Sequence, residues 1–501
     1  MADLTPGEKR WTILYGADKG LEHQALLELY RGFSLYVNYV LPVRAAKDVD
    51  SKTLALQLKP GTDRQNRRYQ PACEHVVLLG TAKTNPIIAD LVDRKVIPAP
   101  TGAQGFTLWI GNSPWNAEHR LIVIAGADAA GVYYGAQELL ASLSDNSVPL
   151  DKPVGRRASL VKMADRVSVE TPAVKERGIW TWGYVIYDYR RFLDNMARLK
   201  FNMLTIWNSE APLNLPEICD YAHQRGIKII AGFNWGWGYK RDISTAEGRQ
   251  FIKELALDAY REEYAGAPID GIYFQSETEH KTQEINGRTV AAWCCDMVNE
   301  IAREFYAIDP KLSIQFGLHA TSIRDHYTDL AGLDPRIIIT WEDAGALPFS
   351  YSPNPNFDDG FEKTLAYSKQ LAAFRPGSQF ALVPKGWLSL RWDDEYAKHG
   401  PFLLGERDPA YLRERLTSRQ GELNAVNSGW LRHYPLAARF YREVLAINPN
   451  ILSTALIEDV MFDARVQSSM ALLGETLWNP HQSDAEILAR ALRPYVTPTT
   501  V

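Results

Sequence analysis

Eight short apolar runs, each followed by a stretch with helical periodicity, recur between residues 178 and 434. The runs are rich in β-branched and aromatic residues and end in polar or aromatic ones. They span residues 178–184, 203–208, 228–237, 271–279, 313–319, 337–343, 380–387 and 423–430. Eight strands alternating with helices predict a (β/α)8 TIM barrel, whose active-site residues lie at the carboxyl-terminal ends of the strands.

Two further segments flank the predicted barrel. Residues 1–165 mix strand-like runs with helical ones, which predicts an amino-terminal α/β domain that ends in a polar linker. Residues 436–501 look helical throughout, with apolar spacing and no visible chemistry. The predicted fold class is therefore α/β, with a catalytic barrel at 166–435 and a carboxyl-terminal helical region at 436–501.

The composition and net charge indicate which kinds of binding partner and which cellular location to expect. A net charge of −5 gives no reason to expect nucleic acid or an anionic membrane surface, and no apolar stretch is long enough to span a bilayer. Four cysteines are too few for a disulfide scaffold. We expect a soluble protein, cytoplasmic as written, or periplasmic or secreted if a signal peptide was removed. The sequence leaves a homo-oligomer open, with the carboxyl-terminal helices as one place for an interface.

Cofactor and metal motifs are missing from the sequence. No glycine-rich phosphate loop, His-Glu-x-x-His motif or Cys-x-x-Cys pair occurs. A metal held by Glu277, His319 and Asp343 at the strand ends has no motif to support it. We therefore expect neither a cofactor nor a metal.

Carboxylates occur at the ends of two predicted strands. In an extended fourth strand, Tyr273, Gln275, Glu277 and Glu279 share one face, and Glu277 lies in an otherwise apolar run. The sixth strand ends in Glu342 and Asp343. Glycoside hydrolysis needs one carboxylic acid to protonate the departing oxygen and a second carboxylate as nucleophile or base. We expect Glu277 as the acid and Glu342 or Asp343 as the partner.

Aromatic residues are concentrated at the same strand ends. Of 14 tryptophans, nine lie at or just beyond them, and flat aromatic faces suit sugar rings. His319, at the end of the fifth strand, is as consistent with a hydrogen-bonded wall residue as with a catalyst. The residues expected to contact substrate are Trp180, Trp182, Trp207, Asn208, Asn234, Trp235, Trp237, Gln275, Glu279, His319, Trp341, Lys385, Trp387, Asn427 and Trp430.

Several segments carry a resemblance to known enzymes. Residues 75–86, residues 124–140 and the Arg177-Gly178 pair resemble the α/β domain and barrel entrance of glycoside hydrolases related to the α-glucuronidases (glycoside hydrolase family 67). Residues 475–480 and 483–488 resemble the helical tail of the α-glucuronidases. The β-hexosaminidases and O-GlcNAc hydrolases are more distantly similar. The resemblance implies a barrel glycosidase acting on an oligosaccharide or polysaccharide.

The resemblance also suggests residue roles. The segment 275–277 is similar to the Asn-Ser-Glu segment that carries the α-glucuronidase general acid, which implies Glu277 as the acid. The family's Gly-Gln-Pro-Gly continuation is replaced here by residues 278–281, and the residues flanking Glu342 and Asp343 do not match. Hexosaminidase-type relatives use two adjacent carboxylates, whereas Thr278 separates Glu277 from Glu279. A uronate substrate would need a positive partner, and the candidates are Lys385, Arg391, Arg177 and Lys240.

We therefore expect a glycoside hydrolase with two-carboxylate chemistry, α-glucuronidase-like in architecture. The alternatives are a β-N-acetylhexosaminidase-like, substrate-assisted glycosidase and a non-catalytic carbohydrate-binding protein. A polysaccharide lyase with Tyr184 or His319 as base is a further alternative. Fold alone does not separate them, because barrels host many functions.

Overall fold

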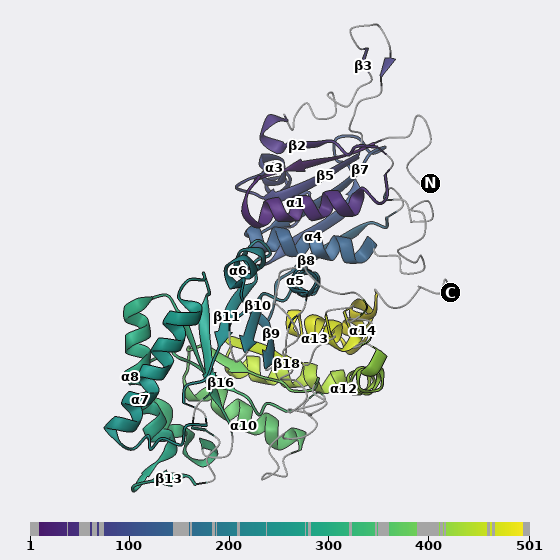
Figure 1. Cartoon of the computed structure of the whole chain (residues 1–501). Coiled ribbons are helices and arrows are strands. Elements are labelled where there is room, and N and C mark those ends of the chain that lie inside the picture. Colours follow the sequence, from purple (N-terminus) through teal and green to yellow (C-terminus); the bar gives the residue numbers. More distant parts are fainter. Residues whose placement is uncertain are drawn as a thin grey trace. The chain divides into compact units, whose positions relative to one another are not determined.

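The computed structural model divides the chain into two compact units, Met1–Pro172 with Leu492–Val501, and Ala173–Ala491 (Figure 1). Each unit is described by itself below. The residues described are 10–37, 39–49, 61–62, 68–69, 75–143, 160, 163–182, 186, 188–207, 211–236, 238–275, 277–278, 282–319, 323–345, 348, 360–387, 410, 414, 417–457, 461–462 and 466–493.

The first unit contains a six-stranded mixed sheet in the order β2-β1-β5-β7-β6-β8. Strands β2, β1, β5 and β7 pair in parallel, and β6 is antiparallel to both β7 and β8. The elements are β1 (Trp11–Tyr15), α1 (Gly20–Phe33), β2 (Val43–Ala45), η1 (Ala46–Asp48), β3 (Gly61–Thr62), β4 (Arg68–Tyr69), β5 (His75–Thr81), α3 (Pro86–Asp93), β6 (Phe106–Asn112), β7 (Arg120–Gly126), α4 (Ala129–Leu143) and β8 (Arg166–Glu170).

Helices cover both faces of this sheet. Helices α1 and α4 lie side by side on one face (Figure 1), where Gly135 of α4 closely approaches Ile124 of β7. Helix α3 packs on the opposite face through Ile87 and Ile88. Asn85 begins α3, because its side-chain oxygen accepts the backbone N–H groups of Ile87 and Ile88 at 3.1 and 3.3 Å.

The second unit is a closed barrel of eight parallel strands in the order β9-β10-β11-β12-β15-β16-β17-β18. This confirms the predicted α/β TIM barrel. The strands are β9 (Glu176–Trp182), β10 (Met203–Trp207), β11 (Lys228–Gly232), β12 (Gly271–Gln275), β15 (Ser313–Leu318), β16 (Ile338–Trp341), β17 (Phe380–Leu382) and β18 (Ile451–Ile457). A short hairpin, β13 (Glu284–Ile285) and β14 (Arg288–Thr289), follows β12.

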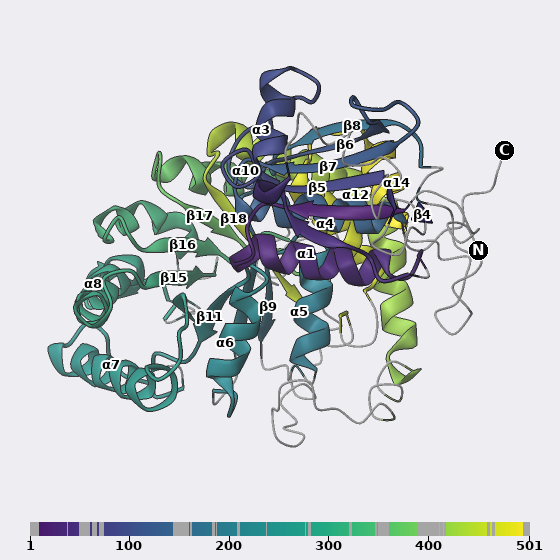
Figure 2. The ribbon, with the colours of Figure 1, turned by 90° about the horizontal axis from the view of Figure 1, so that it is seen from above.

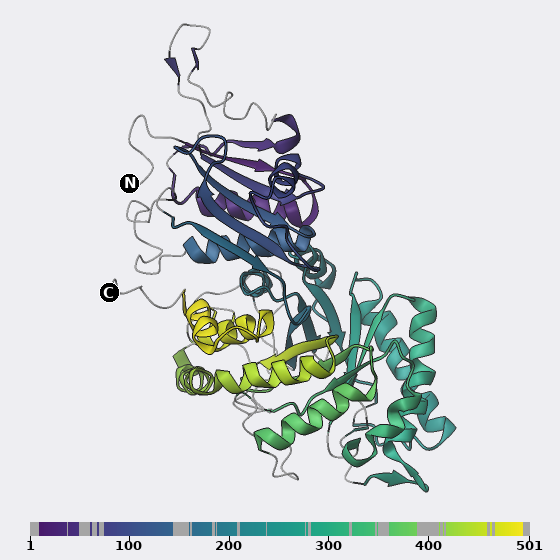
Figure 3. The ribbon, with the colours of Figure 1, turned by 180° about the vertical axis from the view of Figure 1, so that it is seen from behind.

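Helices surround the barrel. Helices α7 and α8 pack side by side (Figure 2), and α12 packs against α10 and α13 (Figure 3). Thr245 and Thr289 begin α7 and α8, because each hydroxyl accepts a backbone N–H three residues on. The elements are α5 (Tyr189–Arg198), α6 (Leu215–His223), α7 (Ala246–Ala259), η4 (Tyr260–Tyr264), α8 (Val290–Ile308), η5 (Arg324–Gly332), α10 (Phe361–Phe374), α12 (Gln420–Ile447), α13 (Ser468–Trp478) and α14 (Asp484–Leu492). Within the described ranges, no helix combines the length and apolar character that crossing a membrane requires.

The eighth strand is not where the sequence pattern predicted it. Residues 423–430 belong to the long helix α12, and the barrel closes through β18 at 451–457, inside the region expected to be helical. The physical reason is visible in the burial of α12: Leu423, Val426, Trp430 and Tyr434 are buried at spacings of three and four residues, the helical period. The barrel therefore extends past the expected boundary at residue 435, and helices α13 and α14 follow its last strand.

Candidate active site

Four charged side chains meet at the carboxyl-terminal ends of three neighbouring barrel strands. His319 follows β15, Glu342 and Asp343 follow β16, and Lys385 follows β17. His319 Nε2 lies 2.8 Å from Glu342 Oε2, and His319 Nδ1 lies 3.2 Å from Asp343 Oδ1. Lys385 Nζ lies 3.7 Å from one oxygen of each carboxylate. We call these four residues the charged cluster.

Strand register explains why Glu342 enters this cluster. Gly317 of β15 pairs with Thr340 of β16, and Glu342 follows Thr340 by two residues, which places both on the same face. A side chain at position 317 has no room, because a Cβ there would lie 2.2 Å from both Glu342 Oε1 and the Tyr273 hydroxyl oxygen. Gly317 is therefore required by the close approach of these two groups.

A buried aromatic group packs around Tyr273 in the barrel interior. The Tyr273 hydroxyl donates a hydrogen bond to Glu342. The Tyr273 ring centroid lies 4.8 Å from that of Trp180 and 5.5 Å from that of Trp207. All three side chains are buried. The aromatic group thus joins the charged cluster directly through the bond from Tyr273 to Glu342.

The cluster holds His319 and Glu342 in their charged forms. Burial lowers the pKa of His319, but the charges of Glu342 and Asp343 outweigh burial and raise that pKa to about 10. Burial raises the pKa of Glu342, but the charge of and hydrogen bond from His319, helped by Lys385 and Tyr273, lower it below its ordinary value. At neutral pH His319 is an imidazolium, whose two ring nitrogens both donate, and Glu342 is a carboxylate.

Glu277 lies on a turn that follows β12, next to Thr278. Strand β12 ends at Gln275, and Glu277 has a φ of 59°, so the extended alternation expected through residue 279 stops before it. The next residue, Thr278, is buried and its hydroxyl accepts a hydrogen bond from the His319 backbone N–H at 3.4 Å. The loop that carries Glu277 is therefore bonded to the residue that joins the two carboxylates. The negative charge of Glu277 also adds to burial in raising the pKa of the Cys294 thiol on α8.

Four of the predicted sugar-binding tryptophans are buried against other aromatic side chains. Trp235 lies beyond the end of β11 and stacks between Phe274 and Phe305, with its ring 5.4 Å from that of Phe305. Trp341 packs edge-on against Tyr367 of α10 at 5.0 Å. The other two, Trp387 and Trp430, stack on each other at 4.4 Å, and both are fully buried. These four rings are buried against other aromatic side chains, and their contact with substrate remains a prediction.

The remaining candidates fall into three groups. Asn427 lies on α12, where its side chain donates to Gln467 and accepts from the backbone N–H of Ser469 at the start of α13. Gln275 shares the face of Tyr273 because it lies two residues further along β12, and Asn234 is partly exposed just after β11. Asn208, Trp237 and Glu279 lie outside the described residues, as do the alternative base Tyr184 and the side chain of Trp182.

Of the cations proposed to meet a uronate, one lies at the charged cluster. Lys385 is buried beside both carboxylates. Arg177 is fully buried elsewhere, where its guanidinium donates to the carbonyl oxygens of Val174 and Lys200. Lys240 is exposed, and Arg391 lies outside the described residues.

Sequence reasoning left Tyr273 out of the candidate residues. The sequence does place Tyr273 two residues before Gln275, on the same face of the strand. Its contact with Glu342, however, depends on how strands that are distant in the sequence pack together. Among the residues that the structure describes, no group of three or more histidine, cysteine, aspartate or glutamate side chains is arranged to hold a metal ion.

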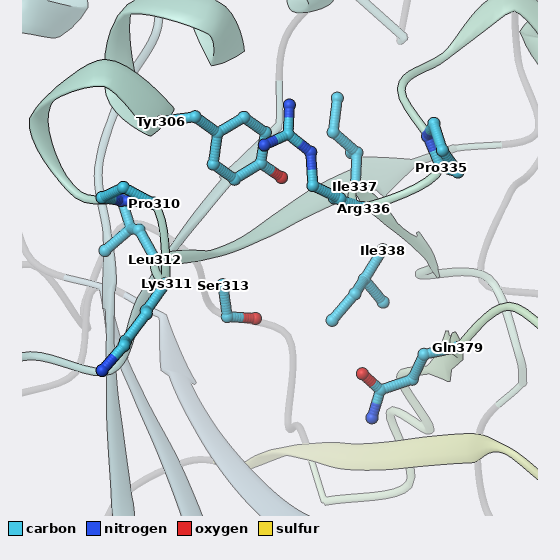
Figure 4. A pocket seen from close by; sticks show the side chains of 10 residues that line it. All are labelled: Tyr306, Pro310, Lys311, Leu312, Ser313, Pro335, Arg336, Ile337, Ile338 and Gln379. Carbon is cyan, nitrogen blue, oxygen red and sulfur yellow. The ribbon is translucent and has the colours of Figure 1, made fainter.

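A separate cavity of about 330 Å³ lies at the opposite end of the barrel strands (Figure 4). Ser313 and Ile338, at the starts of β15 and β16, line it together with Gln379, just before β17. The amino-terminal ends of barrel strands serve stability, whereas active sites lie at the carboxyl-terminal ends. The charged cluster, and not this cavity, is therefore the candidate active site.

Comparison with known proteins supports the architecture. No family model and no curated protein sequence matches the chain. Its fold is similar to the solved structure of BtGH115A, described as a family GH115 4-O-methyl-α-glucuronidase with specificity for decorated arabinogalactans. The TM-score is 0.54 at 12% sequence identity, and the match covers 97% of this chain and 60% of that one. The chain thus spans less than two thirds of that protein's length, and the likeness is one of fold.

Proposed function

We propose that the chain hydrolyses a glycosidic bond in an oligosaccharide or polysaccharide at the carboxyl-terminal end of its barrel. The observation that carries the proposal is the charged cluster: two buried carboxylates, held by His319 and Lys385, lie next to the buried rings of Trp180, Trp207 and Tyr273. Buried charges at this end of a barrel are typical of catalytic sites.

The lowered pKa of Glu342 decides its role in the proposal. A carboxylate that stays ionised is suited to act as nucleophile, as base toward water, or as a charge that stabilises an oxocarbenium-like transition state, but not as a general acid. Asp343 shares His319 with it and is the alternative for the same role. We assign the acid to Glu277, whose loop is bonded to His319 through Thr278.

A uronic acid glycoside is the substrate class that we propose first. The similarity of fold to an α-glucuronidase and the ammonium group of Lys385 at the strand ends support it. Lys385 and His319 formally balance Glu342 and Asp343, so binding of a uronate carboxylate has to compete with those two for Lys385.

Leaving-group chemistry gives a sharp test. Sugar release is measured from uronic acid, acetamido and neutral oligosaccharides, and from the matching aryl glycosides, whose departing phenolate needs no proton. Glu277→Gln should abolish turnover of oligosaccharides but retain turnover of aryl glycosides. Glu342→Gln or Asp343→Asn should abolish both. Glu362→Gln is the matched control, because Glu362 is an exposed partner of Arg439.

Each outcome is informative. Turnover confined to acetamido sugars would favour the substrate-assisted, hexosaminidase-like alternative. Sugar binding without turnover of any substrate would mean that the barrel binds carbohydrate without cleaving it. Full activity of Glu342→Gln and of Asp343→Asn would refute the proposed role of the charged cluster.

A further inference from the structure

Strand β8 forms one edge of the six-stranded sheet in the first unit. Among the described residues it pairs with β6 alone, and the strands follow in the order β8, β6, β7, β5 (Figure 2). An edge strand presents unpaired backbone N–H and C=O groups to any further strand that reaches it. Edges of this kind are usually protected by charged side chains or proline pointing outward.

The outward side chains of β8 are apolar instead. Val167 is 60% exposed and Val169 is 43% exposed, and both lie on the sheet face of their β6 neighbours Trp109 and Thr107. Trp109 is itself only partly buried. The edge strand and the half-covered indole therefore form one apolar strip, which we call the β8 edge.

The sequence of β8 is self-complementary. Residues 166–170 read Arg-Val-Ser-Val-Glu. If a second copy pairs antiparallel about a twofold axis at Ser168, each Val167 lies opposite Val169 of the other copy. In the same register Arg166 at one end of the strand lies opposite Glu170 at the other. Cross-strand pairs of β-branched residues and of opposite charges stabilise antiparallel sheets, and a twofold contact of one patch with itself closes a dimer.

The polar side chains of β8 are already held by contacts within the first unit, and Arg166 also lies 3.9 Å from Glu170 of its own strand. Arg166 lies 2.8 Å from the buried carboxylate of Glu138 on α4, and the Ser168 hydroxyl donates to Glu170 at 2.6 Å. These contacts hold the strand extended and turn Val167 and Val169 to the other face. No ordering of the strand is required before it pairs.

We propose that two copies of this chain dimerise through the β8 edge, which extends the two six-stranded sheets into one. The occupant is a second copy because charge and apolar pattern both match in a single antiparallel register. The paired strands are short, so the dimer is a weak one by the standards of obligate interfaces.

Sedimentation velocity over a range of concentrations tests the dimer. We expect the mass to rise from 56.5 kDa toward twice that value as concentration increases. Lysine at both 167 and 169 should weaken association by about tenfold or more, because like charges then face each other across the twofold axis. Both positions are exposed, and an unchanged circular dichroism spectrum and thermal unfolding midpoint confirm that the variants fold.

A charge-swap rescue then tests the register. Mixing the chain carrying Val167→Lys and Val169→Lys with one carrying Val167→Glu and Val169→Glu should restore the dimer as a heterodimer. A mixture of the Val167→Lys and Val169→Glu chains should form more heterodimer than a mixture of Val167→Lys and Val167→Glu, because position 167 of one copy lies opposite position 169 of the other. A monomer at all concentrations, a dimer that the lysines leave unchanged, or a failure of the mixture to associate would each overturn the proposal.

Discussion

Replacing Glu342 by glutamine removes one charge from the cluster while keeping the shape of the side chain. The variant loses the ion pair of 2.8 Å with His319, although Asp343 and the Tyr273 hydroxyl remain in place. Breaking a buried pair by removing one partner costs about 3 to 5 kcal/mol, because the other charge stays buried. We expect the free energy of unfolding to fall by about 3 kcal/mol, the lower end of that range, because Asp343 still compensates part of the imidazolium charge.

The pKa of His319 gives a second measure of how strongly the cluster stabilises the imidazolium. Its rise from 6.5 to about 10 corresponds to about 5 kcal/mol of stabilisation of the imidazolium, at about 1.4 kcal/mol for each pKa unit. Because the folded pKa lies above the unfolded one, this stabilisation is complete below pH 6.5 and disappears as the pH rises through 10. Without Glu342 the pKa of His319 falls. The variant therefore loses the stabilisation of the imidazolium at a lower pH than the wild type does.

The assay is denaturant unfolding of both proteins at neutral pH and at pH 10, combined with NMR titration of the histidine ring protons. The stability gap between wild type and Glu342→Gln should narrow markedly by pH 10, where His319 loses its proton in the wild type. Glu362→Gln is the control; its carboxylate is 71% exposed, so it should cost less than about 1 kcal/mol at either pH. A gap that does not change with pH, or a wild-type His319 that titrates near 6.5, would refute the reasoning.

Three further variants probe the surroundings of the cluster. Gly317→Ala places a methyl group 2.2 Å from the Tyr273 hydroxyl oxygen and from Glu342, so turnover should fall strongly while circular dichroism stays that of the wild type. Tyr273→Phe removes one donor to Glu342 without changing the packing, so the pKa of Glu342 should rise and the acid limb of the pH profile of kcat/KM should move to higher pH. Trp235→Ala should lower the unfolding free energy by about 3 to 5 kcal/mol and leave KM for oligosaccharides unchanged, because its ring is buried in the core.

Seven of the eight barrel strands were predictable because each is a compact apolar run that ends in a polar or aromatic residue. The eighth failed because residues 423–430 end in Gly-Trp like other strands, although their buried positions follow a helical period. The true strand, 451–457, carries Ile-Leu-Ser-Thr-Ala-Leu-Ile, a β-branched run without chemistry at its end. The residues at 428–430 thus resemble a strand end, whereas the period of the buried positions from 423 to 434 is that of a helix.

The directions in which the candidate side chains point could not be predicted from the sequence. Trp180 and Trp207 point into the barrel, whereas Trp235 and Trp341 face helices, although all four occur near strand ends. Which way a residue faces depends on where its strand stops, and a shift of one position reverses the face. Likewise, the placement of His319 between two carboxylates depends on the register of neighbouring strands, which one chain's pattern does not encode.

The charged cluster restricts where a catalytic proton originates. An imidazolium with a pKa of about 10 is a weak acid at neutral pH, and a carboxylate with a lowered pKa carries no proton there. Glu342 therefore supplies a fixed negative charge, and neither Glu342 nor His319 is suited to give a proton to a departing oxygen at neutral pH. Buried ion pairs also contribute little net stability compared with apolar packing, so stability alone does not explain this one. The proposed hydrolysis therefore needs an acid outside the cluster, and the proposal assigns that role to Glu277, on the loop that Thr278 bonds to His319.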